Sequence, residues 1–208
     1  MNTPRRTFLS TLASIFVSRP ASSEPQPIAA PIIDDLSREP PTATIGTNWQ
    51  LFTDTVMGGV SKATMARETI EGRAAIRLRG NVSLENNGGF VQIVLDLSPD
   101  GGIVDASGWS GIELDVFGNG EEYGVHLRTD ALNRPWQSYR QIFTAYAEWR
   151  TVQLPFDHFV PYRTDVPLDT RRLRRIGVVA IGRAFAPDLA LGGLRFMTLP
   201  RLAKEPSS

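Results

Sequence analysis

The residues best suited to bind a ligand begin with a short run in which Asp54 is followed by Met57, Gly58, Gly59 and Ser61. The two glycines can adopt positive φ angles and bring backbone N–H groups close to a ligand or a neighbouring strand. Asp54 and Ser61 carry oxygens that can hydrogen-bond a polyol. The same side chains can instead satisfy backbone groups in a tight loop that closes the domain. All five are candidate binding residues, with both interpretations open.

The segment around Ser61 partly matches the nucleophile elbow G-x-S-x-G. It reads Gly-Val-Ser-Lys-Ala, so it lacks the second glycine, and no helical pattern follows it. A nucleophile elbow requires a strand, a sharp turn and a helix in that order. We therefore expect no nucleophilic serine here, and no enzyme.

A second candidate surface combines aromatic rings with imidazole, amide and guanidinium groups. Alternation over residues 123–129 places His126 and Arg128 on one strand face with Asp130, and four side chains follow closely: Trp136, Gln137, Tyr139 and Arg140. Rings supply stacking area and polar ends fix orientation, as a sugar- or peptide-binding face requires. The alternative is that Arg128 pairs across strands with Glu113 or Asp115 while the rings pack in the core. The candidate residues are His126, Arg128, Trp136, Gln137 and Tyr139.

Other charged residues are weaker candidates for chemistry. Glu113 and Asp115 are two apart on a predicted strand, about 7 Å between their Cβ atoms, which suits an inverting glycosidase. The same alternation describes an ordinary solvated strand face, which we favour. Asp157 and His158 are too few to define a cation site. The basic run at 171–175 is expected to be solvated, or else to contact acidic lipid or a partner.

Composition excludes several classes of function. The 208 residues hold 22 basic and 22 acidic side chains, and this zero net charge argues against nucleic-acid binding. The absence of cysteine rules out disulfides, thiolate zinc, iron–sulfur clusters and a cysteine nucleophile. Two histidines are too few for a His-rich metal site. We expect no metal and no cofactor.

The N-terminal residues 1–23 read as an export signal. Arg5 and Arg6 precede Phe-Leu and a short apolar stretch with no acidic residue, which is typical of a twin-arginine (Tat) signal. A mitochondrial transit peptide and an uncleaved anchor are alternatives, although the stretch is too short to span a bilayer. Cleavage after Ser23 leaves 19 basic and 22 acidic residues. The Tat reading predicts a periplasmic protein; otherwise it is in the mitochondrial matrix or the cytoplasm.

Five proline residues occur within 24–46, which predicts a linker, and 201–208 reads as a tail. Between them, residues 47–200 alternate apolar and polar side chains in short runs. The clearest runs are 74–78, 90–97, 112–117, 123–129, 137–145, 150–154, 176–181 and 194–199. No long amphipathic helix is present, although a short helical turn is expected after Asp169. About nine strands with this spacing predict an all-β fold, a sandwich of jelly-roll type.

Five segments together resemble the complex I intermediate-associated protein 30 family. They are the run 49–61 (WQLFTDTVMGGVS), the GGF at 88–90, the hairpin 110–120, the segment 149–161 with LPFDHF, and the LD and IG pairs at 168–169 and 176–177. The resemblance spans about 47–199 and implies a galactose-binding-domain-like β-sandwich. Its best-known members assist assembly of mitochondrial respiratory complex I, and it implies no catalytic residue.

The leading hypothesis is therefore a non-enzymatic binding or assembly-factor domain that engages a protein partner, a respiratory-complex subunit or another envelope protein. The alternative is a periplasmic carbohydrate-binding module. Export would place the chain on the opposite side of the membrane from the matrix-side members of the family. Exposure of Tyr123, Trp136 and Tyr139 in a groove would favour sugar; their burial, with an exposed apolar patch elsewhere, would favour a protein partner.

Overall fold

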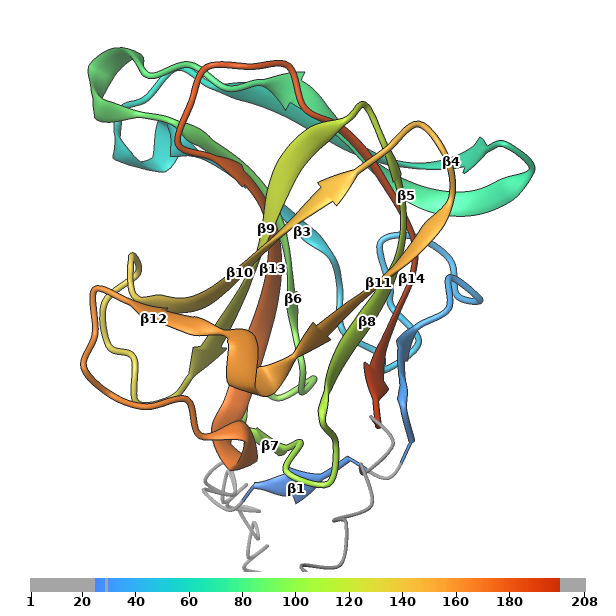
Figure 1. The fold of residues 1–208 in the computed structure, drawn as a ribbon, viewed down its shortest axis with the longest axis vertical. Helices are drawn as coiled ribbons and strands as arrows, with labels where there is room; N and C mark the ends of the chain where they lie inside the picture. The colour runs from blue at the N-terminus through green and yellow to red at the C-terminus, as the bar shows by residue number, and fades with distance from the viewer. Residues whose placement is uncertain (1–24, 29, 199–208) are drawn as a thin grey trace, which may run out of the picture.

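Two β-sheets packed face to face make up the computed structural model, which describes residues 25–28 and 30–198 (Figure 1). The predicted signal peptide and the tail at 201–208 lie outside these residues. The larger sheet has eight strands: β1 (Gln26–Pro27), β3 (Gln50–Thr53), β6 (Phe90–Asp96), β7 (Val104–Asp105), β9 (Glu121–Thr129), β10 (Ser138–Ala145), β12 (Val160–Tyr162) and β13 (Leu173–Ile181). The smaller sheet has six: β2 (Ile32–Asp34), β4 (Lys62–Ile70), β5 (Arg73–Asn81), β8 (Gly111–Gly118), β11 (Arg150–Pro155) and β14 (Asp188–Met197).

Nearly all strand pairs are antiparallel. In the larger sheet β6 lies between β3 and β13, and β9, β10 and β12 follow on the other side of β13. Only β1 and β7 pair in parallel within the described chain. Four short 3₁₀ helices interrupt the strands: η1 (Asp54–Met57), η2 (Glu85–Asn87), η3 (Phe156–His158) and η4 (Thr170–Arg172). The predicted all-β sandwich is confirmed, while its jelly-roll connectivity stays a prediction.

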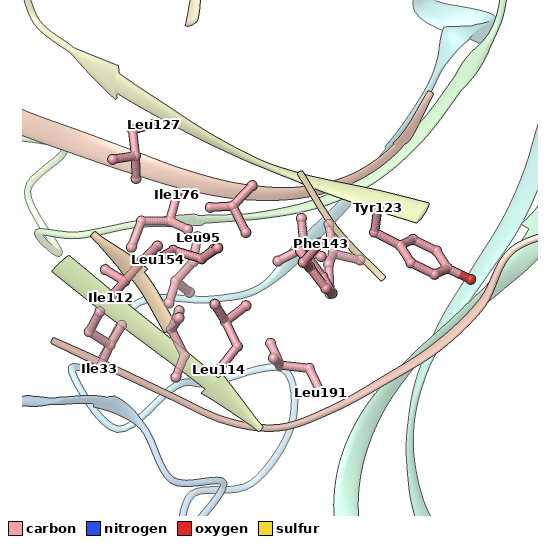
Figure 2. Packing of buried hydrophobic residues seen from close by; sticks show 14 of the residues in the cluster. Ile33, Leu95, Ile112, Leu114, Tyr123, Leu127, Phe143, Leu154, Ile176 and Leu191 are labelled. Atoms are coloured by element: carbon pink, nitrogen blue, oxygen red, sulfur yellow. The ribbon is translucent and has the colours of Figure 1, made fainter. Parts of the chain in front are cut away.

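The core lies between the two sheets and is built by the period-two alternation. Figure 2 shows Leu95, Leu127 and Ile176 of the larger sheet close to Ile112 and Leu114 of the smaller sheet. Each of these side chains is buried. Burying one Leu or Ile contributes roughly 1.5–3 kcal/mol, so alternation on this scale fixes which face of each strand turns inward.

The segment predicted as a linker, 24–46, is not a linker throughout. Its strand β2 pairs with β14, and Ile33 is buried in the core. The buried Asp34 accepts a hydrogen bond of 2.7 Å from the indole Nε1 of Trp49, and Ala43 is also buried. Prolines favour extended backbone, and here the extended segment also pairs with β14, a central strand of the smaller sheet. The folded domain therefore begins well before residue 47.

Two further expectations have clear outcomes. The helical turn after Asp169 is confirmed as η4, where the Asp169 carboxylate accepts from the Arg171 N–H at 3.0 Å. Strand β4 was not among the predicted runs, because its alternating positions hold small or charged side chains such as Ala63 and Arg67. In the part of the chain that the structure describes, no helix is long and apolar enough to cross a bilayer.

Candidate functional site

Asp54 is the centre of a buried hydrogen-bond network at one end of the sandwich. It opens η1 directly after β3, and its carboxylate is fully buried. One oxygen accepts from the Ser61 N–H at 2.9 Å, and the other accepts from the Ser61 hydroxyl and from the N–H groups of Gly89 (2.6 Å) and Phe90 (3.3 Å). Burial by itself raises the pKa of Asp54, but these hydrogen bonds outweigh it and hold the pKa below its usual value.

Glycines of the segments 54–61 and 88–90 leave space for the Asp54 carboxylate. A Cβ atom added at Gly59 would lie 2.4 Å from Asp54 Oδ1, and one at Gly88 would lie 2.4 Å from Asp54 Oδ2. Gly58 ends η1 with φ +89°, and Gly89 has φ +130°, both in the region that favours glycine. The runs at 54–61 and 88–90, which are distant in sequence, therefore form one structure around Asp54 (Figure 1, upper left).

This network turns apolar side chains toward solvent. Val56 and Met57 of η1 are 67% and 61% exposed, Val60 is 39% exposed, and Leu84, just before η2, is 53% exposed. We call these four residues the tip surface. The structure thus assigns the five candidates of this run different places: Asp54 and Ser61 are buried and bonded internally, and only Met57 presents a large exposed side chain.

The outer face of the larger sheet carries a second candidate site. Strand register places Arg140, His126, Gly177, Val94 and Gln50 in one row across five strands. The next row holds Ile142, Gly124, Val179, Gln92 and Phe52. A hollow of about 240 Å³ opens over the part of these rows that β10, β9 and β13 contribute. We call it the sheet hollow; its lining is Glu122, Tyr123, Gly124, His126, Arg140, Ile142, Val179, Ile181, Gly182 and Arg183.

His126 and Arg140 are the polar centre of the sheet hollow. A Cβ atom added at Gly124 would lie 3.2 Å from His126 Nε2, so the glycine leaves space for the ring. Burial, and secondarily the charge of Arg140, lowers the pKa of His126 to about 3, so the imidazole is neutral at pH 7. The Arg140 guanidinium lies 3.4 Å from the centre of the Tyr162 ring, and its Nε donates to the Ser138 hydroxyl at 2.9 Å.

The remaining candidates of the second set lie elsewhere. Arg128 does not pair with Glu113 or Asp115, and that expectation is wrong because β8 belongs to the other sheet. It donates instead to the backbone carbonyls of Leu132, Arg134, Pro135 and Gln137, and so holds the 130–137 loop.

The ring-bearing residues are divided between core and surface. Tyr139 is fully buried and its hydroxyl donates to the Pro167 carbonyl, and Tyr123 is buried as well. Trp136 is 49% exposed on the 130–137 loop, where the Gln137 side chain bonds Arg134 and Arg163 backbone groups. Of the five candidate binding residues of the second set, only His126 lines the sheet hollow, and Tyr123 lines it as well. Sequence reasoning missed Ile142, Tyr162 and Ile181, because register between strands cannot be read from one strand's pattern.

The other charged candidates either form ion pairs within the protein or lie exposed on its surface. Glu113 and Asp115 both bond Arg195 on the outer face of the smaller sheet, at 2.6 and 2.8 Å. Partial burial by itself raises the pKa of Asp115, but the hydrogen bonds from Arg195 and Thr151 and the charges of Arg195 and Arg73 outweigh it and lower the pKa. Asp157 and His158 are exposed and 3.8 Å apart. Residues 25–28 and 30–198 contain no group of three or more His, Cys, Asp or Glu placed to hold a metal ion.

Comparisons with known proteins agree with this architecture. Residues 41–191 match the family model described as complex I intermediate-associated protein 30 (CIA30). A search of curated proteins finds no match.

Among solved structures, the chain is similar to a family 11 carbohydrate-binding module from Clostridium thermocellum in complex with a β-1,3-1,4-mixed-linked tetrasaccharide. The two are 16% identical with a TM-score of 0.63, and the match covers 81% of this chain and 95% of that chain. A family 11 module of the cellulosomal cellulase Lic26A-Cel5E of the same organism is 14% identical with a TM-score of 0.64, covering 83% and 96%. A family 30 carbohydrate-binding module is 15% identical with a TM-score of 0.53, covering 72% and 87%. These likenesses show a shared fold.

Proposed function

The chain belongs to the complex I intermediate-associated protein 30 family, and we propose that it is a non-catalytic domain that holds an apolar segment of a protein partner on its tip surface. The observation that carries this proposal is the exposure of Val56, Met57, Val60 and Leu84 on loops fixed by the Asp54 network. A rigid apolar surface binds without a large ordering cost, because its backbone is already held. Burial of Tyr123 and Tyr139 also favours a protein partner over sugar stacking; Trp136 is 49% exposed but does not line the sheet hollow.

The partner class follows from the family and from the N-terminus. An assembly role predicts an unassembled subunit of a respiratory complex, whose interface is still apolar and uncovered. Export through the signal proposed at 1–23 would instead make the partner another envelope protein. Fractionation of the native host, with the mature N-terminus read by mass spectrometry, separates these two: a periplasmic chain that starts near Glu24 favours the envelope partner.

The tip surface is tested in the native host with the tagged full-length chain. Met57→Asp combined with Val60→Asp places two charges on the surface, and we expect at least a tenfold loss of the co-purifying complex without a change in melting temperature. Val166→Asp, at an exposed apolar residue outside the tip, is the matched control and should retain the complex. A complex that survives the double substitution, or a wild-type chain that forms none, contradicts the proposal.

The sheet hollow supports a second candidate function, saccharide binding. It offers a neutral imidazole, a guanidinium and a carboxylate beside the apolar side chains Ile142 and Ile181, the mixture that a sugar's hydroxyls and C–H faces require. The likeness to carbohydrate-binding modules adds support at the level of fold. Calorimetry with a β-1,3-1,4-mixed-linked tetrasaccharide tests it: binding that is lost in His126→Ala supports saccharide recognition here, and binding unaffected by that change contradicts it.

A further inference from the structure

The arginines on the sheets are mostly paired inside the protein, and Arg140 is different. On the larger sheet, Arg175 bonds both oxygens of Asp96, at 2.7 and 3.0 Å, and Arg128 donates to four backbone carbonyls. Arg140 lies on the adjacent strand β10 and is half-buried, yet it forms no ion pair with any carboxylate of the described residues. A half-buried cation without a counter-ion is unfavourable unless a ligand supplies one.

The surroundings of Arg140 hold its guanidinium ready for a planar anion. One face of the group lies 3.4 Å from the centre of the Tyr162 ring, and its Nε is fixed by Ser138. The two terminal amino groups then form the edge that pairs with a carboxylate through two parallel hydrogen bonds. Burial lowers the pKa of Arg140, with Tyr162 opposing this, but the group stays charged at neutral pH.

The rest of the sheet hollow suits a ring that bears hydroxyl groups. His126 is cross-strand neighbour to Arg140, and neither ring nitrogen has a hydrogen-bond partner among the described residues. Gly124 carries no side chain, and the His126 ring takes up the space above it in the lining of the hollow. Glu122 lies four residues from His126 along β9, about 13 Å at the rise of a strand, and can accept hydroxyl hydrogen bonds at the far end.

We infer that the sheet hollow binds an acidic saccharide, one that contains uronic acid residues, with its carboxylate on Arg140 and a ring hydroxyl on His126. This inference rests on the second proposed function, saccharide binding at the same site, and adds the class of sugar. An acidic peptide would offer the carboxylate but not the ring hydroxyls that the neutral imidazole and Glu122 address.

The test measures binding of the full-length chain by isothermal titration calorimetry. The probes are tetragalacturonate, tetramannuronate and a glucuronate-containing hyaluronan tetrasaccharide, each beside its methyl ester, together with the neutral mixed-linked tetrasaccharide and tetraglutamate. We expect at least one acidic saccharide to bind tenfold or more tightly than its ester, since the ester keeps the ring and removes the charge. Raising the salt from 50 to 500 mM should weaken that preference.

Variants then assign the preference to Arg140. Arg140→Met should weaken acid binding tenfold or more and ester binding by less, so that the preference for the acid over its ester falls at least tenfold. Arg140→Lys, which keeps the charge without the two-pronged edge, should give an intermediate loss. Arg174→Met removes an exposed arginine of β13 and is the matched control, expected to bind as wild type. Retained melting temperatures confirm that the variants are folded.

Each outcome decides a different claim. Equal binding of acids and esters, or an acid preference that survives Arg140→Met, overturns the acidic-saccharide inference and leaves saccharide binding standing. No binding of any saccharide overturns both. Binding of tetraglutamate alone through Arg140 would show that the anion comes from a protein and would also overturn the inference.

Discussion

Replacing Asp54 by Asn tests whether the buried network builds the tip. The carboxylate accepts from four donors, three of them backbone N–H groups at Ser61, Gly89 and Phe90. An amide of the same shape has one acceptor oxygen, so in either orientation at least one backbone N–H faces another donor. An unsatisfied buried donor costs about 1–3 kcal/mol, and loss of the charge weakens each remaining bond by about 1 kcal/mol. With three bonds remaining, these predict about 4–6 kcal/mol of lost stability.

Two measurements test this predicted loss of stability. Chemical denaturation followed by tryptophan fluorescence gives the free energy of unfolding, and the melting temperature should fall by about 10–20 °C for a domain of this size. Amide hydrogen exchange should show reduced protection at Ser61 and Gly89 specifically. Because the folded pKa of Asp54 lies below its unfolded value, its contribution is present above that unfolded value and is lost as pH falls through the folded pKa. The gap between wild type and Asp54→Asn should therefore close in acid.

Asp157→Asn provides the matched control, since Asp157 is highly exposed and should change stability by less than about 0.5 kcal/mol. An Asp54→Asn protein with wild-type stability and unchanged protection at Gly89 would refute the reasoning. A loss that is constant between pH 7 and pH 2 would show that packing, and not the charged hydrogen bonds, holds the loops.

Three further predictions follow from single contacts. Gly88→Ala should destabilise the fold by more than about 2 kcal/mol, because its Cβ would overlap the Asp54 carboxylate, whereas Gly108→Ala, with open space at its Cβ, should be neutral by the same denaturation assay. His126 has a folded pKa of about 3 against an ordinary 6.5. The free energy of unfolding of the wild type should therefore fall by at most about 2 kcal/mol between pH 7 and pH 5, because only the unfolded imidazole gains a proton in that range. The free energy of unfolding of His126→Gln should fall by less over the same range. Asp34→Ala leaves a buried indole N–H without its acceptor and should cost about 1–3 kcal/mol in denaturant titrations; wild-type stability would mean that the bond from Trp49 to Asp34 does not stabilise the fold.

Strands with one strongly apolar face could be predicted from sequence, and less regular ones could not. Strands β6, β8 and β9 alternate large apolar and polar side chains, so burial of one face dictates their conformation. Strand β4 is held by its pairing with β5 along its full length, and its own pattern is weak. Strand β2 contributes one core side chain, Ile33, from a proline-rich context that otherwise indicates a linker.

The candidate sites were predictable by residue type but not by exposure. The sequence identified His126 and nearby Arg140, yet their neighbours across the sheet depend on register between strands separated by up to 90 residues. Tyr139 and Trp136 are three residues apart and equally suited to stack on a ligand, but one is in the core and the other on a loop. Whether an aromatic ring binds a ligand is therefore decided by packing that a local pattern does not contain.

The motif at 54–61 illustrates why a family signature and a binding site need not coincide. Its most restrictive positions are Asp54, Gly59 and Ser61. The polar atoms of Asp54 and Ser61 bond to each other inside the tip, and the lack of a side chain at Gly59 leaves space for the Asp54 carboxylate. The side chains free to contact a partner, Val56 and Met57, only need to be apolar and exposed. The signature thus describes how the tip is built, and under the proposed function the exposed residues between its fixed points would determine what the tip binds. Exchanging those exposed residues should change the partner without changing the fold.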